Sequence, residues 1–361
     1  MVLTRPWRLP TALWVVPVGE VGGVGRHVLD VADIGVPGHR LVVQCPPGPL
    51  ADRLRAGGAA VVTAPVGPGY GIRASVGAVR HLVGTLRPAI THSHLSWADV
   101  VAATAVVGLP TSLVTTEHGI ADDDLVYHGT RVRARLKAVA HTARLRRADA
   151  VIAVAEATAV TLRAKWHPAR STPVRVIRNG VDRPAATPRR SPGLHVVSIA
   201  RLSPEKRIDH VLRAFALLHA EHPGSRLTVA GNGPEAAALS DLACDLGLAD
   251  AVAFVGHVDP VPLLQSADVL AQLSVWENCS YSILDALAHG VGVVATPVGG
   301  NPEMLPAAAL VAHDDHAAVA HAIGAQGLRP ADRPSLRPEW PDRAAMCVAI
   351  GEVYDGVRSL R

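Results

Sequence analysis

The sequence has few aromatic residues, which make up 3% of its 361 residues. Proteins that bind single-stranded nucleic acid stack the bases on aromatic side chains, and no pattern of a known nucleic-acid-binding module appears. The net charge of +4 therefore does not indicate a nucleic-acid partner. With so few large rings, the cores must be built from Ala, Val and Leu, which is typical of parallel sheets covered by helices.

Cysteine is also scarce, and the four cysteines lie far apart, at Cys45, Cys244, Cys279 and Cys347. Their spacing fits neither a metal site nor a disulfide framework, so we expect free thiols in a reducing compartment. The apolar stretch at residues 11–18 is too short to span a membrane and lacks a cleavage-like region. It is predicted to be a buried strand, and the sequence predicts a cytoplasmic protein.

Lysine occurs only at positions 137, 165 and 206, so arginine carries most of the positive charge. Basic residues cluster on what is predicted to be one helix: Arg131, Arg133, Arg135, Lys137, Arg144, Arg146 and Arg147. These side chains either form a solvated helix face or attract an anionic acceptor or an anionic membrane surface. The second alternative would place the protein peripherally at the inner face of a membrane.

The first half of the chain alternates apolar runs with stretches of helical spacing. Strands are predicted at residues 13–18, 40–44, 60–63, 112–116 and 150–154, and helices at 26–34 and 76–86. Strands that alternate with helices indicate βαβ units and a parallel sheet.

A proline-rich stretch without periodicity, at residues 183–193, is predicted to be a linker. A second series follows, with predicted strands at 195–200, 226–230, 251–255, 269–271 and 291–296, and helices at 208–219, 235–246, 260–266 and 282–289. A chain of this length can bury two cores. We expect Rossmann-like α/β domains at residues 1–182 and 194–338, and a C-terminal helix within 339–361 that packs back on the first domain.

Two cations, Arg201 and Lys206, flank a loop between a predicted strand and the helix that begins at residue 208. Together they could hold a diphosphate, and the helix N-terminus adds backbone N–H donors and a favourable dipole for the same anion. The structural alternative is a pair of surface charges near a helix start.

Two carboxylates, Glu277 and Asp285, lie eight positions apart, after a strand predicted to end at Trp276. A loop carboxylate can accept hydrogen bonds from sugar hydroxyls, and one placed a turn into the next helix could reach a ribose. Glycines 299 and 300 follow the next strand, where the backbone turns sharply or approaches another group closely. Acids spaced by chance and a plain turn are the structural alternatives.

Motifs that are weak singly follow one another in a specific order. The second half contains Ala200-Arg-Leu with Glu205-Lys206-Arg, Gly231-Asn-Gly-Pro, Phe254-Val-Gly-His, Glu277-x7-Asp285 and Gly299-Gly-x-Pro-Glu303. The first half adds Gly22-Gly-Val-Gly25-Arg-His, Thr91-His-Ser-His94, Thr116-Glu-His118-Gly and Arg178-Asn-Gly-Val-Asp182. In this order and spacing the sequence resembles the family 4 retaining glycosyltransferases of the GT-B fold. The resemblance implies two Rossmann-like domains that face each other across a cleft.

The same resemblance implies the roles of the site residues. Arg201 and Lys206 would bind the diphosphate of a nucleotide-sugar donor, Glu277 the transferred sugar, and Asp285 the ribose. The other residues assigned to donor binding are Gly22, Gly23, Gly231, Asn278, Tyr281, Ser282 and Ile283. His118 would contact the donor sugar from the first domain, with a buried or loop histidine as the alternative.

The implied reaction moves a sugar, with retention of configuration, from a UDP- or GDP-linked donor to a hydroxyl of a glycan, lipid-linked or small-molecule acceptor. The acceptor would attack on the face that the diphosphate leaves, and the leaving group would help to take its proton. Cations and the helix N-terminus near Ser282 would stabilise the charge that builds on the diphosphate. No metal or other cofactor is expected, because the acidic run at 122–124 lacks the ligand set expected for Mg²⁺.

The sequence departs from the family pattern at two places. Asp285 stands where Glu is usual and is about 1.5 Å shorter, so its contact with ribose would be bridged by water. The segment after Glu277 usually carries glycines and a phenylalanine, and Asn278, Cys279, Ser280 and Tyr281 replace them here.

Three other functions fit part of the pattern. A nicotinamide-dependent dehydrogenase would require a different glycine spacing at 22–25 and an acid after the second strand, which ends at Gln44. A sugar-nucleotide epimerase of the same fold shares the cleft but not the order of motifs. A non-catalytic nucleotide-sugar-binding protein is suggested by the altered segment at 277–281.

Overall fold

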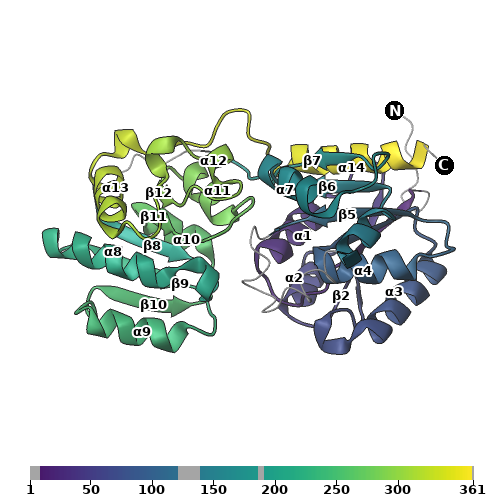
Figure 1. Cartoon of the computed structure of the whole chain (residues 1–361), viewed down its shortest axis with the longest axis horizontal. Coiled ribbons are helices and arrows are strands. Elements are labelled where there is room, and N and C mark those ends of the chain that lie inside the picture. Colours follow the sequence, from purple (N-terminus) through teal and green to yellow (C-terminus); the bar gives the residue numbers. More distant parts are fainter. Residues whose placement is uncertain (1–8, 121–138, 186–190, 360–361) are drawn as a thin grey trace. The chain divides into compact units, whose positions relative to one another are not determined.

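The computed structural model describes residues 9–120, 139–185 and 191–359, and the chain divides into two compact units. The first unit consists of Met1–Gly180 together with Pro341–Arg361, and the second consists of Val181–Trp340 (Figure 1). The chain therefore returns to the first unit at its C-terminal end. The residues of the predicted linker belong to the second unit.

The first unit contains a seven-stranded sheet in which every pairing is parallel, in the order β3-β2-β1-β4-β5-β6-β7. Its strands are β1 Thr11–Val15, β2 Arg40–Cys45, β3 Ala60–Thr63, β4 Ile90–His94, β5 Ser112–Glu117, β6 Ala150–Ala153 and β7 Val174–Val176. Its helices are α1 Gly23–Ile34, α2 Pro49–Ala56, α3 Ile72–Leu86, α4 Leu95–Ala105, α7 Glu156–Trp166 and α14 Arg343–Ser359. No strand was predicted at the positions of β4 and β7.

Helices cover both faces of this sheet, as the alternation of side chains along β1 shows. Ala12 and Trp14 belong to one apolar cluster, which includes residues of α1, α2 and α14. Leu13 and Val15 belong to another, which includes residues of α3 and α4. A strand that is buried on both faces has a continuous apolar sequence, as residues 12–16 do.

The C-terminal helix α14 packs on the first unit through its buried face. Tyr354 is fully buried, and its hydroxyl accepts a hydrogen bond of 2.7 Å from Nε1 of Trp14. The same hydroxyl lies 2.6 Å from Nδ1 of His92, whose Nε2 lies 2.7 Å from Oγ1 of Thr116. Every polar group is satisfied when Tyr354 donates to His92 and Nε2 of His92 carries the proton.

The second unit contains a five-stranded parallel sheet in the order β10-β9-β8-β11-β12. Its strands are β8 His195–Ile199, β9 Arg226–Ala230, β10 Val252–Gly256, β11 Val269–Gln272 and β12 Gly292–Ala295. Its helices are α8 Ile208–Glu221, α9 Ala236–Asp245, α10 Pro260–Ser266, α11 Tyr281–Ala288, α12 Asn301–Met304 and α13 His316–Leu328. Phe215 of α8 is fully buried in its core. The two α/β units confirm the predicted fold class.

Strand order identifies where each unit is suited to bind a ligand. In the first sheet β1 lies between β2 and β4, and in the second β8 lies between β9 and β11. The connections that leave β1 and β4, like those that leave β8 and β11, run to opposite sides of such a switch point, and ligands bind there beyond the carboxyl ends of the strands. The loops that follow these four strands are therefore the places to seek a site.

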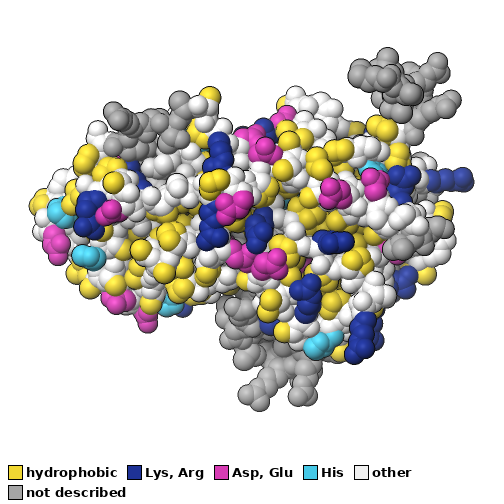
Figure 2. All heavy atoms as spheres, turned by 90° about the horizontal axis from the view of Figure 1, so that it is seen from above, with side chains coloured by type: hydrophobic (Ala, Val, Ile, Leu, Met, Phe, Trp, Pro, Cys, Tyr) yellow, Lys and Arg dark blue, Asp and Glu magenta, His cyan; other side chains and the backbone are white. Residues whose placement is uncertain are grey.

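The basic cluster predicted at 131–147 falls partly outside the described residues, which exclude Arg131, Arg133, Arg135 and Lys137. Arg146 and Arg147 are exposed. Arg144 is not part of an exposed face, because it is buried between two carboxylates. On the face drawn in Figure 2, basic side chains are interspersed with acidic and apolar ones. Within the described residues, no helix is both long enough and apolar enough to cross a membrane.

Candidate functional site

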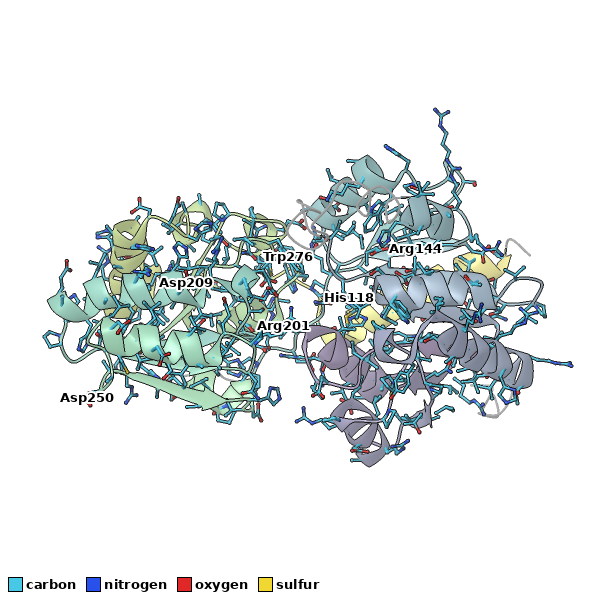
Figure 3. All side chains as sticks on the ribbon, turned by 60° about the horizontal axis from the view of Figure 1, so that its bottom comes forward. His118, Arg144, Arg201, Asp209, Asp250 and Trp276 are labelled. Carbon is cyan, nitrogen blue, oxygen red and sulfur yellow. The ribbon has the colours of Figure 1, made fainter. Side chains whose placement is uncertain are left out.

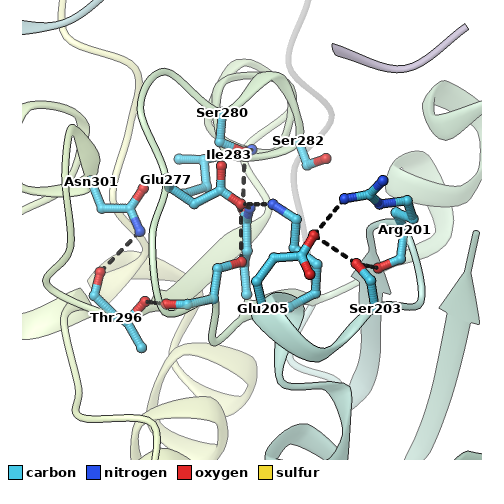
Figure 4. A network of polar contacts seen from close by, with 12 residues as sticks. Arg201, Ser203, Glu205, Glu277, Ser280, Ser282, Ile283, Thr296 and Asn301 are labelled. Carbon is cyan, nitrogen blue, oxygen red and sulfur yellow. Dashed lines mark hydrogen bonds and ion pairs between the residues drawn. The ribbon is translucent and has the colours of Figure 1, made fainter. Parts of the chain in front are cut away.

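The loop after β8 holds Arg201 beside the buried carboxylate of Glu205, which lies in a predicted motif but was assigned no role. Nη2 of Arg201 lies 2.6 Å from Oε1 of Glu205, which also accepts a 2.8 Å hydrogen bond from Oγ of Ser203 (Figure 4). Burial alone would raise the pKa of Glu205, but the hydrogen bonds from Ser203 and Arg201 outweigh it and lower this pKa. The Arg201 side chain stays 66% exposed, so its remaining N–H groups face solvent.

Lys206 and Glu277, which are 71 residues apart in sequence, meet at the carboxyl edge of the second sheet. Nζ of Lys206 contacts Oε1 of Glu277. The same oxygen accepts hydrogen bonds from Nε2 of Gln272, at 2.7 Å, and from Oγ of Ser274, at 2.9 Å. The structure thus brings together two predicted site residues and adds two supporting residues from β11 and the loop after it.

A ring also lies beside the Lys206 ammonium, which is 5.7 Å from the ring centroid of Trp276. This distance is within the range of a cation–π contact. Trp276 (Figure 3) does not end a strand as predicted, because β11 ends at Gln272. The strand itself lies where it was predicted, at 269–271 with one more residue, and Glu277 lies in the segment between β11 and α11.

Glycines allow the backbone segments around these side chains to approach closely. Gly299 has a φ of +50°, and a Cβ there would lie 1.7 Å from the carbonyl oxygen of Glu277. Gly231 has a φ of +134°, and a Cβ there would lie 1.8 Å from the carbonyl oxygen of Ala200. Each glycine thus fixes the backbone next to a predicted donor-binding residue.

Helix α11 follows Glu277 and carries four of the other predicted donor-binding residues, namely Tyr281, Ser282, Ile283 and Asp285. Its N-cap is Ser280, whose Oγ accepts from the backbone N–H of Ile283. Oγ of Ser282 donates to the carbonyl oxygen of Ile199 at 3.2 Å, which ties α11 to the end of β8. Asp285 is 2% exposed. Asn278 and Tyr281 are buried as well.

The glycines of the first unit play different roles from one another. Gly22 is the N-cap of α1 and Gly23 is its first residue, three positions before the predicted start of this helix. Neither would place a Cβ within 4 Å of another group. A Cβ at Gly25 would instead lie 2.7 Å from the carbonyl oxygen of Glu20. Packing therefore explains Gly25 and leaves Gly22 and Gly23 without a structural constraint of this kind.

His118 directly follows β5, is partly buried, and packs against two buried imidazoles, those of His27 and His94. Its Nε2 lies 2.9 Å from Nδ1 of His94, and its ring lies edge-on to that of His27, with centroids 4.9 Å apart. Burial lowers the pKa of His27 to about 4, although the nearby side chain of Asn179 partly offsets this. Burial and the neighbouring imidazoles also lower the pKa of His94 and of His118 well below the usual value. These rings are therefore neutral at pH 7.

The residue before His118 belongs to a buried ionic group that the sequence analysis missed. Nη2 of Arg144 lies 2.5 Å from Oε1 of Glu117, and Nη1 lies 2.8 Å from Oδ2 of Asp99. Oγ1 of Thr115 donates to Oδ1 of Asp99 at 2.6 Å. Arg144 and His118 both belong to the first unit (Figure 3). The ion pairs anchor the end of β5, and with it the position of His118.

Two family models match the chain. The model described as Glycosyltransferase Family 4 matches residues 21–183, and the model described as Glycosyl transferases group 1 matches residues 193–325. The chain belongs to glycosyltransferase family 4. The family predicted from the order of motifs is thereby confirmed, and a nicotinamide-dependent dehydrogenase is inconsistent with this membership.

Similar proteins place this glycosyltransferase among diverse relatives. It is 28% identical over 332 residues to a glycogen synthase from Mycobacterium tuberculosis, covering 81% of this chain and 78% of the relative. It is 32% identical over 217 residues to a D-inositol 3-phosphate glycosyltransferase from Mycobacteroides abscessus, covering 54% of this chain and 47% of the relative. The solved structure of Anabaena HepE with UDP-glucose superposes on this chain with a TM-score of 0.76 and is 20% identical in sequence. The match covers 97% of this chain and 98% of HepE.

Proposed function

We propose that this glycosyltransferase transfers a sugar, with retention of configuration, from a nucleoside diphosphate-sugar to an acceptor hydroxyl. The observation that carries the proposal is the contact between Lys206 and Glu277. It places a cation suited to a diphosphate directly beside a carboxylate suited to a sugar hydroxyl. A nucleoside diphosphate-sugar presents these two groups next to each other.

Charge and exposure support the assignment of each side chain. Arg201 keeps exposed N–H groups while Glu205 fixes the side chain at one end. The contacts of Glu277 to Lys206, Gln272 and Ser274 all involve Oε1. Within the described residues Oε2 makes no hydrogen bond, which leaves it to accept one from a sugar hydroxyl.

The proposed mechanism uses electrostatic stabilisation and no enzyme nucleophile. As the bond between sugar and diphosphate breaks, negative charge builds on the diphosphate, and Arg201 and Lys206 stabilise it. The acceptor hydroxyl attacks from the face that the diphosphate leaves and gives its proton to that leaving group. The two cations offset the diphosphate charge, so we propose that transfer needs no divalent metal. Full activity in EDTA supports this, and activity that is lost and then restored by Mg²⁺ contradicts it.

The donor is proposed to be UDP- or GDP-linked. The solved structure of HepE with UDP-glucose supports testing UDP first. A thermal-shift panel of UDP, GDP, ADP and their sugars decides between bases, since a ligand that binds only the folded state raises the unfolding temperature. If no nucleotide in the panel shifts that temperature, the assignment of the donor class is wrong.

The acceptor is proposed to be a hydroxyl of a glycan, a lipid-linked saccharide or a small molecule. The names of relatives suggest glycogen and D-inositol 3-phosphate as first acceptors to test. NMR of the product's anomeric proton distinguishes retention from inversion. Peripheral contact with a membrane through residues 131–147 is also proposed, and unchanged vesicle binding after neutralising Arg146 and Arg147 contradicts it.

Lys206→Ala tests the proposed site itself. Removing one preorganised stabiliser of developing charge costs about 100- to 1000-fold in rate, and we expect transfer to fall by that factor. Arg213→Ala is the matched control, because Arg213 is an exposed cation on α8 of the same unit. Near-normal turnover of a folded Lys206→Ala variant would contradict the assignment of Lys206 to the donor diphosphate.

A further inference from the structure

Three imidazoles converge in the first unit, beside Trp14. One ring nitrogen each from His27, His94 and His118 lies within 4.8 Å of the other two. Zinc binds imidazole nitrogen at about 2.0–2.1 Å, which places tetrahedral ligands roughly 3.4 Å apart. Small side-chain rotations would thus bring the three nitrogens onto one ion.

The order of strands brings these histidines together from separate parts of the sequence. His94 is the last residue of β4, and His118 directly follows Glu117, the last residue of β5. His27 lies in α1, the helix that follows β1. The strands β1, β4 and β5 are neighbours in the sheet. The ligands would therefore be held at one edge of the sheet by rigid elements, which favours a precise site.

Three buried ring nitrogens of the cluster have no hydrogen-bond partner among the described residues. His27 is 2% exposed, and neither of its ring nitrogens makes a hydrogen bond of normal geometry to a described residue. The Nε2 atom of the fully buried His94 likewise lacks such a partner among the described residues. Buried polar atoms are normally paired. His92 shows the contrast, because Tyr354 and Thr116 satisfy both of its nitrogens.

We propose that His27, His94 and His118 bind one transition-metal ion of the zinc type through three neutral imidazole nitrogens. Imidazole suits Zn²⁺, Co²⁺, Ni²⁺ and Cu²⁺, whereas Mg²⁺ and Ca²⁺ prefer oxygen ligands. His118 is only partly buried, so solvent can supply a fourth ligand. His118 is also the residue predicted to contact the donor sugar, so the metal site shares this one residue with the predicted transferase site. Arg201, Lys206 and Glu277 are not among its ligands.

Cobalt is the probe that tests the site directly, because four-coordinate Co²⁺ has visible absorption bands that report nitrogen ligation. The whole chain, without any polyhistidine tag, is titrated with Co²⁺ and then with Zn²⁺. Trp14 provides a second signal, since its ring stacks on His27 with centroids 5.7 Å apart. We expect one Co²⁺ per chain, quenched tryptophan fluorescence and displacement by Zn²⁺. A wild-type chain that binds neither ion overturns the proposal.

His27→Ala and His94→Gln identify the ligands. We expect either change to weaken binding by at least about tenfold, since even indirect supports of metal ligands have effects of 10- to 100-fold. Zn²⁺ should raise the unfolding temperature of the wild type and not that of His27→Ala. His316→Ala is the matched control, because His210 and His316 pair in the second unit at 2.9 Å between ring nitrogens.

Equal affinity in the wild type and in folded His27→Ala and His94→Gln variants would show that the metal binds elsewhere, and it would overturn the proposal. The proposal would also be overturned if His316→Ala lost metal binding while His27→Ala and His94→Gln kept it. None of these measurements uses a sugar donor. A negative result for metal binding therefore leaves the proposed transferase site unaffected, and a negative result for sugar transfer leaves the metal site unaffected.

Discussion

Nη2 of Arg144 lies 2.5 Å from Oε1 of Glu117, in the interior of the first unit. The same guanidinium also contacts Asp99, so two buried carboxylates share one positive charge. Full ionisation would leave one negative charge uncompensated in a medium of low dielectric constant. Burial therefore raises the pKa of Glu117 to about 7, although Arg144 opposes this shift. Burial raises the pKa of Asp99 for the same reason.

We expect Arg144→Ala to lower the free energy of unfolding by about 3–5 kcal/mol, because it leaves two buried carboxylates without their partner. Urea unfolding followed by circular dichroism measures the change. Arg146→Ala is the control, since Arg146 is exposed two residues further on, and surface changes usually stay within about 0.5 kcal/mol. Equal loss of stability in the two variants would contradict the role given to Arg144.

The raised pKa of Glu117 predicts how stability depends on pH. A carboxyl whose pKa is higher in the folded chain binds more protons there than in the unfolded chain, so its contribution is greatest below pH 4.5. This contribution is lost as the pH rises through about 7. We expect the stability of the wild type relative to Glu117→Gln to fall between pH 4.5 and 7. A difference that is constant, or that grows with pH in this range, would show that the pKa is not raised.

Arg144 also shows where reasoning from the sequence stops. Its neighbours at 146 and 147 are exposed, as a run of basic residues predicts. The burial of Arg144 depends on Asp99 of α4 and Glu117 of β5, which are distant in sequence. No local pattern links the three residues. Only Glu117, the acid directly after the strand predicted at 112–116, gives a signal that a buried cation is required.

The second unit was more predictable, because its strands are short apolar runs that end in loops with charged residues. The loops that carry Arg201, Lys206 and Glu277 each follow a strand, as predicted, although the strand before Glu277 ends at Gln272 and not at Trp276. The contact between Lys206 and Glu277 was not predicted, and neither was the support from Gln272. These contacts depend on the order of strands, which places the ends of β8 and β11 side by side.

The hydroxyl of Tyr354 is predicted to contribute to stability through its two buried partners, Trp14 and His92. Tyr354→Phe keeps the ring but leaves the indole N–H and Nδ1 of His92 unpaired. A buried polar group left unsatisfied costs about 1–3 kcal/mol, and we expect a loss of at least that size in urea unfolding. Tyr70→Phe is the control, because Tyr70 is 46% exposed. Unchanged stability of Tyr354→Phe would mean that water or another group satisfies both partners.

Gly299→Ala is predicted to disrupt the donor site through the backbone and not through a lost contact. The residue has a φ of +50°, and the added Cβ would lie 1.7 Å from the carbonyl oxygen of Glu277. Because both groups are backbone, one of the two segments must move, and Glu277 would lose its position beside Lys206. We expect the affinity for UDP, measured by calorimetry, to fall at least tenfold, together with the unfolding temperature.

Gly224→Ala separates this steric effect from the general effect of replacing a glycine. Gly224 also lies in a loop of the second unit, and a Cβ there would meet no other group within 4 Å. Its unfolding temperature and UDP affinity should therefore match those of the wild type. If Gly299→Ala bound UDP as well as Gly224→Ala does, the position of Glu277 would not depend on the close approach at Gly299. The carboxylate would then be held by Gln272, Ser274 and Lys206 alone.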